Sequence, residues 1–199
     1  MAPFRLALVA VFVLLAGAGC GGDEPSRPTP PPPPGVSTVA IASPGGTVLS
    51  ALGDTLRLTA TPRAANGSTV AGAEVVWTSS SPEVATVTST GLVTAIGNGS
   101  ATMTAAVGSV TATVAITVEQ AVASVVVSPE AWAPTALQLT QQFTATARDA
   151  NENPIAGAVF VWQADQGGPV TVTPEGLATA ERVGTTSLRA TVAGGTGTA

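Results

Sequence analysis

Side chains that carry most enzyme chemistry are missing from this chain of 199 residues. It has no histidine, and its seven basic residues are all arginine. A Ser-His-Asp triad, a Ser-Lys dyad, a lysine Schiff base and a histidine-ligated metal therefore cannot form within it. A phosphate-binding P-loop also needs a lysine. We therefore expect no enzyme activity, no catalytic residues and no cofactor.

One short segment spaces oxygen-bearing side chains as a cation site would. Asp149, Asn151 and Asn153 alternate like the first ligands of a calcium loop. However, Pro154 stands where an EF-hand has its glycine, and Phe160 stands where it has its bidentate glutamate. A polar hairpin turn explains the segment better. We therefore predict no metal site, and keep calcium binding by these three residues as the alternative.

The chain contains the same module twice, with an offset of 85 positions and no gap. Residues 42–114 align with residues 127–199, so that Trp77 falls on Trp162 and Gly91 falls on Gly176. A repeat of this length is a whole small domain rather than a solenoid unit. The sequence therefore predicts a tandem of two like modules.

The three tryptophans are the remaining candidates for contact with a ligand. Trp77 and Trp162 lie among alternating apolar residues, which indicates that both are structural core positions. Trp132 follows Pro129 near the start of a strand and has no aromatic counterpart in the first module. We therefore predict that Trp132 is an exposed aromatic side chain and a possible ligand contact.

Both modules consist of short segments with alternating apolar residues, separated by turns. About seven such segments in the first module, with an Asn66-Gly67 hairpin signal, are typical of a β-sandwich. No segment after the first nineteen residues has helical periodicity. We predict an all-β fold with two tandem β-sandwich modules, at residues 36–118 and 122–199. The short hinge at residues 119–121 should restrict their rotation.

Three segments of the first module follow a known pattern: Trp77–Val87, Thr90–Ala95 and Gly99–Thr102. In these segments the chain resembles the group 2 bacterial Ig-like domain. The second module keeps the tryptophan but has residues 164–168 (ADQGG) where the first has residues 79–83 (SSSPE), so this loop should differ in shape. The resemblance implies Ig-like sandwiches on an exported bacterial protein, and adhesion or a spacer role only by association.

The first 35 residues indicate export and anchoring. Residues 1–19 contain the apolar run Leu6–Ala18, which is too short to span a membrane and typical of a signal peptide. The run leads into Cys20 through small residues that resemble a bacterial lipobox, although Gly17 stands where leucine is usual. The resemblance implies that Cys20, the only cysteine, is lipidated. In similar lipoproteins an aspartate after the cysteine resembles a signal for retention at the inner membrane, and Gly21 in this position favours the outer membrane. Residues 20–35 form a proline-rich, semi-rigid linker.

The second module stops early in the alignment of the two copies. It has no counterpart of Ala115–Val118, and its glycine-rich end at residues 194–198 is a poor strand sequence. We therefore expect the second module to lack its last strand and to have an open sheet edge. Two explanations stay open: the chain is a fragment, or a strand from a partner or from a dimer fills the gap.

These features together favour a non-enzymatic lipoprotein of the bacterial cell envelope, anchored to the membrane by lipid and located at the outer membrane or cell surface. Its modules would serve as a stalk or as an adhesion array for a surface glycan or protein ligand. The net charge of −5 provides no basic surface for nucleic acid. The alternative is a spacer or carbohydrate-binding region of a larger envelope enzyme, with a catalytic domain beyond Ala199.

Overall fold

The computed structural model describes residues 35–199, and every regular element in this range is a β-strand. No helix able to cross a membrane occurs among these residues. The expected all-β fold class is therefore confirmed. The strands of the first module are β1 (Thr38–Ala42), β2 (Val48–Leu49), β3 (Thr55–Arg57), β4 (Thr59–Arg63), β5 (Val76–Ser79), β6 (Ala85–Val87), β7 (Leu92–Ala95), β8 (Gly99–Val107) and β9 (Val110–Val118).

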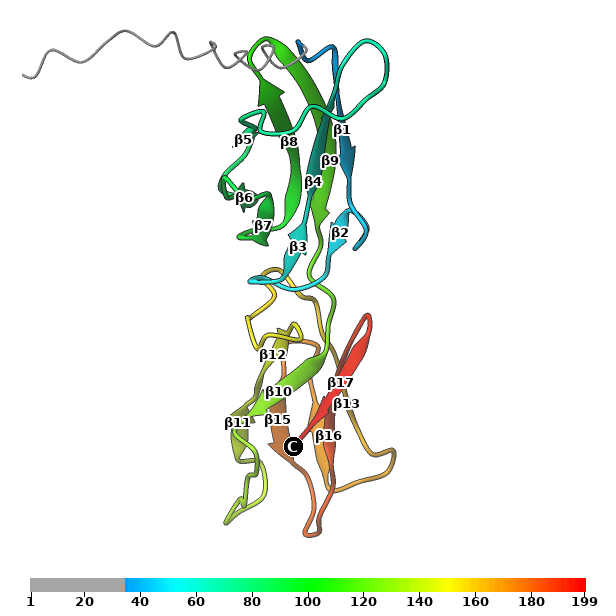
Figure 1. Ribbon diagram of the computed structural model, residues 1–199. Helices are drawn as coiled ribbons and strands as arrows, with labels where there is room; N and C mark the ends of the chain where they lie inside the picture. The colour runs from blue at the N-terminus through cyan, green and yellow to red at the C-terminus, as the bar shows by residue number, and fades with distance from the viewer. Residues whose placement is uncertain (1–34) are drawn as a thin grey trace, which may run out of the picture. The chain divides into compact units, whose positions relative to one another are not determined.

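Two sheets enclose the core of the first module (Figure 1). One sheet has the strand order β2-β9-β8-β5 and the other has the order β3-β7-β6, while β1 pairs with β4. The long hairpin of β8 and β9 closes between Val107 and Val110. Gly108 in this two-residue turn has a φ of 59°, a left-handed conformation that glycine adopts without strain. The turn therefore fixes the register of the longest strand pair.

Alternation along the strands places apolar side chains between the two sheets. Leu58, Val93, Met103 and Ile116 are at most 1% exposed, and Trp77 packs against their cluster. Removing such side chains from water stabilises a fold by about 1.5–3 kcal/mol each. Residues at alternate positions of the strands thus form the core of the first module, and Trp77 packs there as the sequence indicated.

The second module repeats this plan with the same offset of 85 positions. β11 to β15 begin and end at positions equivalent to those of β3 to β7. Every strand pairing among the described residues lies within residues 38–118 or within residues 124–198. The strands are β10 (Ser124–Ser128), β11 (Thr140–Gln142), β12 (Thr144–Arg148), β13 (Val161–Ala164), β14 (Val170–Val172), β15 (Leu177–Ala180), β16 (Leu188–Val192) and β17 (Gly195–Thr198).

The last strand of the second module is shortened rather than absent, which corrects the sequence prediction. β17 pairs with β16 over four residues, whereas β9 pairs with β8 over nine. A Cβ atom on Gly197 would lie 2.7 Å from the carbonyl oxygen of Val125 and 2.8 Å from its Cγ1 atom. Glycine therefore suits this position, and sheet pairing needs only its backbone groups.

The core of the second module is smaller than that of the first. Its buried cluster has five residues, whereas the cluster of the first module has ten. Ile116 and Val118 of β9 belong to the larger cluster, and they have no counterparts in β17.

Candidate functional site

The linker between the modules is held by backbone hydrogen bonds. The described residues, 35–199, which include both modules, belong to one compact unit. The N–H groups of Glu119 and Ala121 donate to carbonyls of residues 49–50, at 3.0 and 2.8 Å. These bonds extend the parallel pairing of β2 with β9 into the linker. The N–H of Ala123 then donates to the carbonyl of Arg148 at 2.8 Å, where β10 and β12 begin to pair.

Gln120, the middle residue of the linker, connects both modules. Its backbone N–H donates to Oδ1 of Asn98 at 2.9 Å, and its Oε1 accepts from Nδ2 of Asn98 at 3.0 Å. Its Nε2 donates to Oδ2 of Asp149 at 2.9 Å. The side chain therefore joins the loop between β7 and β8 to the turn that follows β12.

Asp149 is fully buried and accepts hydrogen bonds from both modules. Its Oδ2 accepts from the backbone N–H of Leu52 at 2.9 Å, in addition to the bond from Gln120. Its Oδ1 accepts from the N–H groups of Asn151 and Asn153 at 3.0 and 2.9 Å. Burial raises the pKa of the carboxyl, but the hydrogen bonds from Gln120 and from the three backbone groups outweigh it and lower the pKa from 3.8 to about 2. Asp149 is therefore charged at neutral pH.

The two asparagines of the same turn bind the first module directly. Nδ2 of Asn151 and Nδ2 of Asn153 each donate to the carbonyl of Leu52 at 3.0 Å. Nδ2 of Asn151 also donates to Oδ1 of Asp54 at 3.0 Å. Both backbone groups of Leu52 are thus bound by the turn of the second module. We call these residues the junction cluster: Leu52, Asp54, Asn98, Gln120, Asp149, Asn151 and Asn153.

The junction cluster gives the three candidate calcium ligands a different role. The oxygens of Asp149 face N–H donors, and the amides of Asn151 and Asn153 present hydrogens to the first module. A calcium site needs oxygen atoms turned toward the ion. The described residues also contain no group of three or more acidic, histidine or cysteine side chains placed for a metal. The arrangement fits the polar hairpin turn that the sequence favoured.

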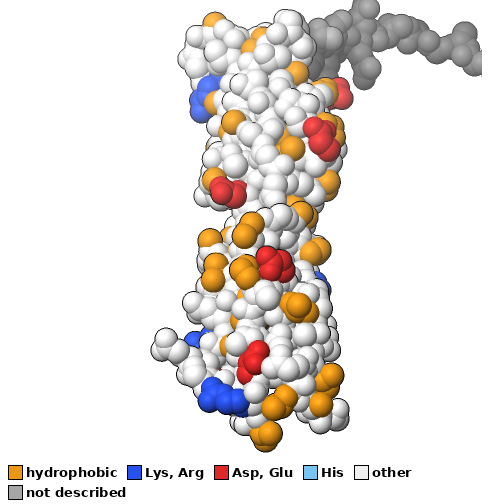
Figure 2. Space-filling model, turned by 180° about the vertical axis from the view of Figure 1, so that it is seen from behind, with side chains coloured by type: hydrophobic (Ala, Val, Ile, Leu, Met, Phe, Trp, Pro, Cys, Tyr) orange, Lys and Arg blue, Asp and Glu red, His pale blue; other side chains and the backbone are white. Residues whose placement is uncertain are grey.

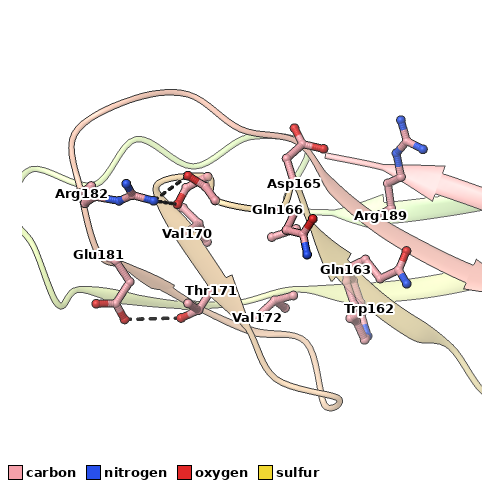
Figure 3. A pocket seen from close by; sticks show the side chains of 13 residues that line it. Trp162, Gln163, Asp165, Gln166, Val170, Thr171, Val172, Glu181, Arg182 and Arg189 are labelled. Carbon is pink, nitrogen blue, oxygen red and sulfur yellow. Dashed lines mark hydrogen bonds between the residues drawn. The ribbon is translucent and has the colours of Figure 1, made fainter.

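A second candidate site is a hollow in the second module, between β13 and β14 (Figure 3). Its volume is about 820 Å³, and it lies beside the loop at residues 164–168, where the two modules differ. Side chains of Gln163, Asp165 and Arg189 lie on one side, and those of Thr171 and Glu181 lie on the other. The sequence predicted that this loop would differ in shape, but not that it would border a hollow.

Arg182 holds the loop at one side of this hollow. Its Nη2 atom donates to the carbonyls of Gly167 and Gly168 at 2.5 and 2.8 Å. On the side of Arg182 in Figure 3, the hydroxyl of Thr171 donates to Oε1 of Glu181 at 3.4 Å. These five groups therefore use part of their hydrogen-bonding capacity within the protein. No bond to the side chains of Gln163, Gln166 or Arg189 occurs within the described residues, so these three can serve a ligand.

The surroundings of one of the three tryptophans differ from those that the sequence predicted. Trp77 and Trp162 are half-buried and pack against the cores of their modules, as core residues would. The ring of Trp162 lies 6.5 Å from that of Phe143, centroid to centroid. Trp132 is also half-buried and packs against the second core, so it is not the exposed side chain that we expected. It still lines a hollow of about 180 Å³, and its contact with a ligand stays a prediction.

Two further expectations concern the N-terminal segment and the surface charge. Cys20 and the signal-like residues 1–19 lie outside the described residues, as does most of the proline-rich linker. On the face drawn in Figure 2, acidic and basic side chains lie singly or in small groups. That face therefore presents no extended basic surface of the kind that binds nucleic acid.

Comparison with known proteins gives one family match. Residues 73–120 match the model of the bacterial Ig-like domain, named Big-like. Comparison with curated proteins found no match. The matched segment begins before β5, contains Trp77 and Gly91, and ends at Gln120 in the linker.

Solved structures with similarity to this chain include three surface proteins. Invasin, described as a bacterial integrin-binding protein, is 21% identical over 81% of this chain and 38% of that chain, with a TM-score of 0.48. The Escherichia coli adhesin FdeC is 18% identical over 80% of this chain and 62% of that chain, with a TM-score of 0.42. The S-layer protein SbsC is 21% identical over 82% of this chain and 27% of that chain, with a TM-score of 0.37. This chain thus spans about a quarter of the S-layer chain. Residues 73–120 are thus similar to a bacterial Ig-like domain, in the part of the chain where the sequence showed this resemblance.

Proposed function

We propose that this chain is a non-enzymatic lipoprotein of the bacterial cell envelope, tethered at Cys20, whose Ig-like modules serve as a stalk or adhesion array. The junction cluster carries this proposal. A stalk must hold successive modules in a fixed relation, and here the linker and both modules share one set of hydrogen bonds around a buried carboxylate. The absence of histidine and lysine from the sequence agrees with a role in binding or spacing rather than catalysis.

The location can be tested in cells that produce the full chain with its own N-terminus. We expect the protein in the membrane fraction, accessible to protease added to whole cells. A Cys20→Ser variant should leave the membrane fraction, because the thiol is the attachment point that the lipobox resemblance implies. Recovery of the unaltered chain from the cytoplasm would contradict the proposal.

The adhesion role can be tested by attachment of the same cells to glycan-coated and protein-coated surfaces under flow. We expect more attachment with the chain than without it, and a loss when Gln120→Ala and Asp149→Asn are combined. Glu152→Gln, in the same turn but exposed and outside the junction cluster, is the matched control. Surface amounts should be equal for all variants. Attachment that is the same with and without the chain would count against adhesion and leave only the stalk role.

The hollow beside residues 164–168 favours a second, narrower role, which is binding of a glycan by the second module. Glycan sites contain a few convergent polar groups, and Gln163, Gln166 and Arg189 line this hollow. These polar side chains have amide and guanidinium donors suited to hydroxyl or carboxylate groups of a sugar. This role agrees with either a free adhesin or a carbohydrate-binding region of a larger enzyme.

Glycan binding can be measured by titrating the purified chain with envelope polysaccharide fragments and following backbone amide resonances. We expect shifts at residues 163–168 and 189, and at least a tenfold weaker affinity for a Gln163→Ala, Arg189→Ala variant. Arg57→Ala, an exposed arginine of the first module, is the matched control. Resonance shifts only at residues outside the hollow would rule out this site. Equal affinities of the native chain, the double variant and Arg57→Ala would also rule it out.

A further inference from the structure

Two asparagines of this chain precede a glycine, and both begin the same tripeptide, Asn-Gly-Ser. Asn66 lies in the hairpin turn that follows β4, and Asn98 lies in the loop between β7 and β8. Asparagine is a thermolabile residue. Its side-chain amide is attacked most easily by the backbone nitrogen of a following glycine, which has no side chain to hinder the approach. Because the two tripeptides are identical, a difference between their reactivities has to come from the structure.

The turn that contains Asn66 leaves the reacting groups accessible. Residues 65–69 are all exposed, and nothing lies within 4 Å of the position that a Cβ atom on Gly67 would take. The side-chain oxygen of Asn66 accepts from the N–H and the hydroxyl of Ser68, at 3.0 and 2.7 Å. Both donors draw electrons from the amide carbon and so favour attack on it. The attacking N–H of Gly67 is held only by a bond to the carbonyl of Ala64, at 2.9 Å in the same exposed turn.

Asn98 is exposed as well, but both ends of its amide are bound by Gln120. Its Oδ1 accepts from the backbone N–H of Gln120 at 2.9 Å, and its Nδ2 donates to Oε1 of Gln120 at 3.0 Å. The residue that would attack, Gly99, begins β8 and pairs with Val118. A Cβ atom on Gly99 would lie 3.0 Å from Cγ2 of Val84, so the backbone is closely packed here. Rotation of the amide toward the nitrogen of Gly99 therefore has to break both hydrogen bonds to Gln120.

We propose that Asn66 is a site of spontaneous deamidation and that Gln120 protects Asn98 from the same reaction. In the first step, a bond forms between the backbone nitrogen of Gly67 and the side-chain carbon of Asn66. The bond from that carbon to Nδ2 breaks, and the proton of the Gly67 nitrogen leaves with the amide as ammonia. A water molecule then opens the cyclic imide at either carbonyl, which gives aspartate or isoaspartate. Each event adds one negative charge to the chain.

The protected asparagine is the one on which the contact between the modules depends. A carboxylate only accepts hydrogen bonds, so conversion of Asn98 to aspartate would leave no donor for Oε1 of Gln120. It would also place a second negative charge on a side chain that already binds the carboxylate of Asp149. The same conversion at Asn66 changes only an exposed turn of the first module. This inference does not depend on the stalk or adhesion role.

The test is incubation of the purified full chain at mildly alkaline pH, followed by mass spectrometry of the peptides that contain the two asparagines. In the folded chain we expect conversion of Asn66 at least tenfold faster than that of Asn98. In the chain unfolded by urea, the two rates should be equal within about twofold, because the tripeptides are the same. Equal rates in the folded chain, or no conversion of Asn66, would overturn the proposal. This comparison needs no variant and is independent of any variant's folding.

A variant tests whether Gln120 is the protecting residue. Gln120→Ala removes the side-chain bond to Asn98 and keeps the backbone bond, so the rate at Asn98 should rise at least threefold. The rate at Asn66 should not change and serves as the reference within the same molecule. Glu119→Ala, an exposed neighbour in the linker outside the junction cluster, is the matched control and should keep Asn98 slow. An unchanged rate at Asn98 in Gln120→Ala would refute the protection.

Discussion

The carboxylate of Asp149 accepts a hydrogen bond at 2.9 Å from the backbone N–H of Leu52, which lies 97 positions earlier in the sequence. The two residues belong to different modules, and the linker residue Gln120 donates to the same oxygen. A buried charge is tolerated only when its hydrogen bonds are complete. The bonds of the junction cluster are therefore expected to form and to break together.

Asp149→Ala should destabilise the protein strongly. The substitution leaves the part-buried N–H groups of Leu52, Asn151 and Asn153 without their acceptor, and each group that stays unsatisfied costs about 1–3 kcal/mol. Because the turn can relax, we expect a total loss of about 3 kcal/mol in the free energy of unfolding. Urea denaturation measures it. Glu152→Gln, exposed in the same turn, should change stability by less than about 0.5 kcal/mol. Equal stabilities of the two variants would show that the junction cluster does not form.

The pKa of Asp149 predicts how stability depends on pH. A carboxyl whose pKa falls from 3.8 to about 2 on folding stabilises the folded state above pH 3.8, and this contribution is lost as the pH falls through 2. Since one pKa unit corresponds to about 1.4 kcal/mol, the contribution is about 2 kcal/mol. We expect Asp149→Asn to be less stable than the native chain by about this amount at pH 7.

The comparison of these two proteins isolates Asp149 from the other carboxyl groups. Asp54 also lies in the junction cluster, but it is present in both proteins. The difference in their free energies of unfolding should be constant from pH 7 to about 5 and should shrink toward zero near pH 2. Denaturation with urea at a series of pH values measures this difference. A difference in the free energies of unfolding that stays unchanged down to pH 2 would mean that the pKa of Asp149 is not lowered by folding.

Gln138→Gly should stabilise the second module. Gly53 has a φ of 83° in the loop that presents Leu52, and the equivalent Gln138 keeps this left-handed conformation with a φ of 60°. A residue other than glycine is strained there, so the substitution should raise the free energy of unfolding by up to about 1 kcal/mol. Gln141→Gly, in the extended strand β11, should lower it by about 1 kcal/mol instead. Thermal denaturation compares the two variants. A loss of stability in both would show that the backbone at Gln138 is not strained.

The fold was predictable because its signals are local. Alternating apolar residues define the strands of the first module, and the aligned pattern gives β11 to β15 the same bounds as β3 to β7. β17 was not predictable from strand propensity, because its glycines are selected by contact with Val125 of β10. Propensity describes a strand in an average setting, whereas this strand crosses a neighbour that leaves no room for a Cβ atom.

The junction cluster could not be predicted, because its partners are distant in the sequence. Its only sequence signal is a departure between the copies: Asp149 aligns with Ala64, and Asn153 aligns with Ser68. The alternating oxygens of this turn favoured a polar hairpin turn, with calcium as the alternative, but the hydrogen bonds that the turn makes depend on the neighbouring module. Likewise, the altered loop at residues 164–168 was visible in the alignment, but the hollow that it borders was not.

Gly176→Ala should show how closely the ring of Trp162 packs against the backbone at Gly176. A Cβ atom on Gly176 would lie 2.6 Å from the carbonyl oxygen of Phe143 and 2.9 Å from Cε2 of Trp162, and the φ of this residue is 84°. Backbone strain and overlap with the ring together should cost about 3 kcal/mol. Gly167→Ala has a similar φ of 74° but nothing within 4 Å of the added atom, so it should cost only about 1 kcal/mol. Denaturation followed by tryptophan fluorescence measures both losses. A larger loss for Gly176→Ala is the contribution of close packing, and equal losses would mean that the ring can move away at no cost.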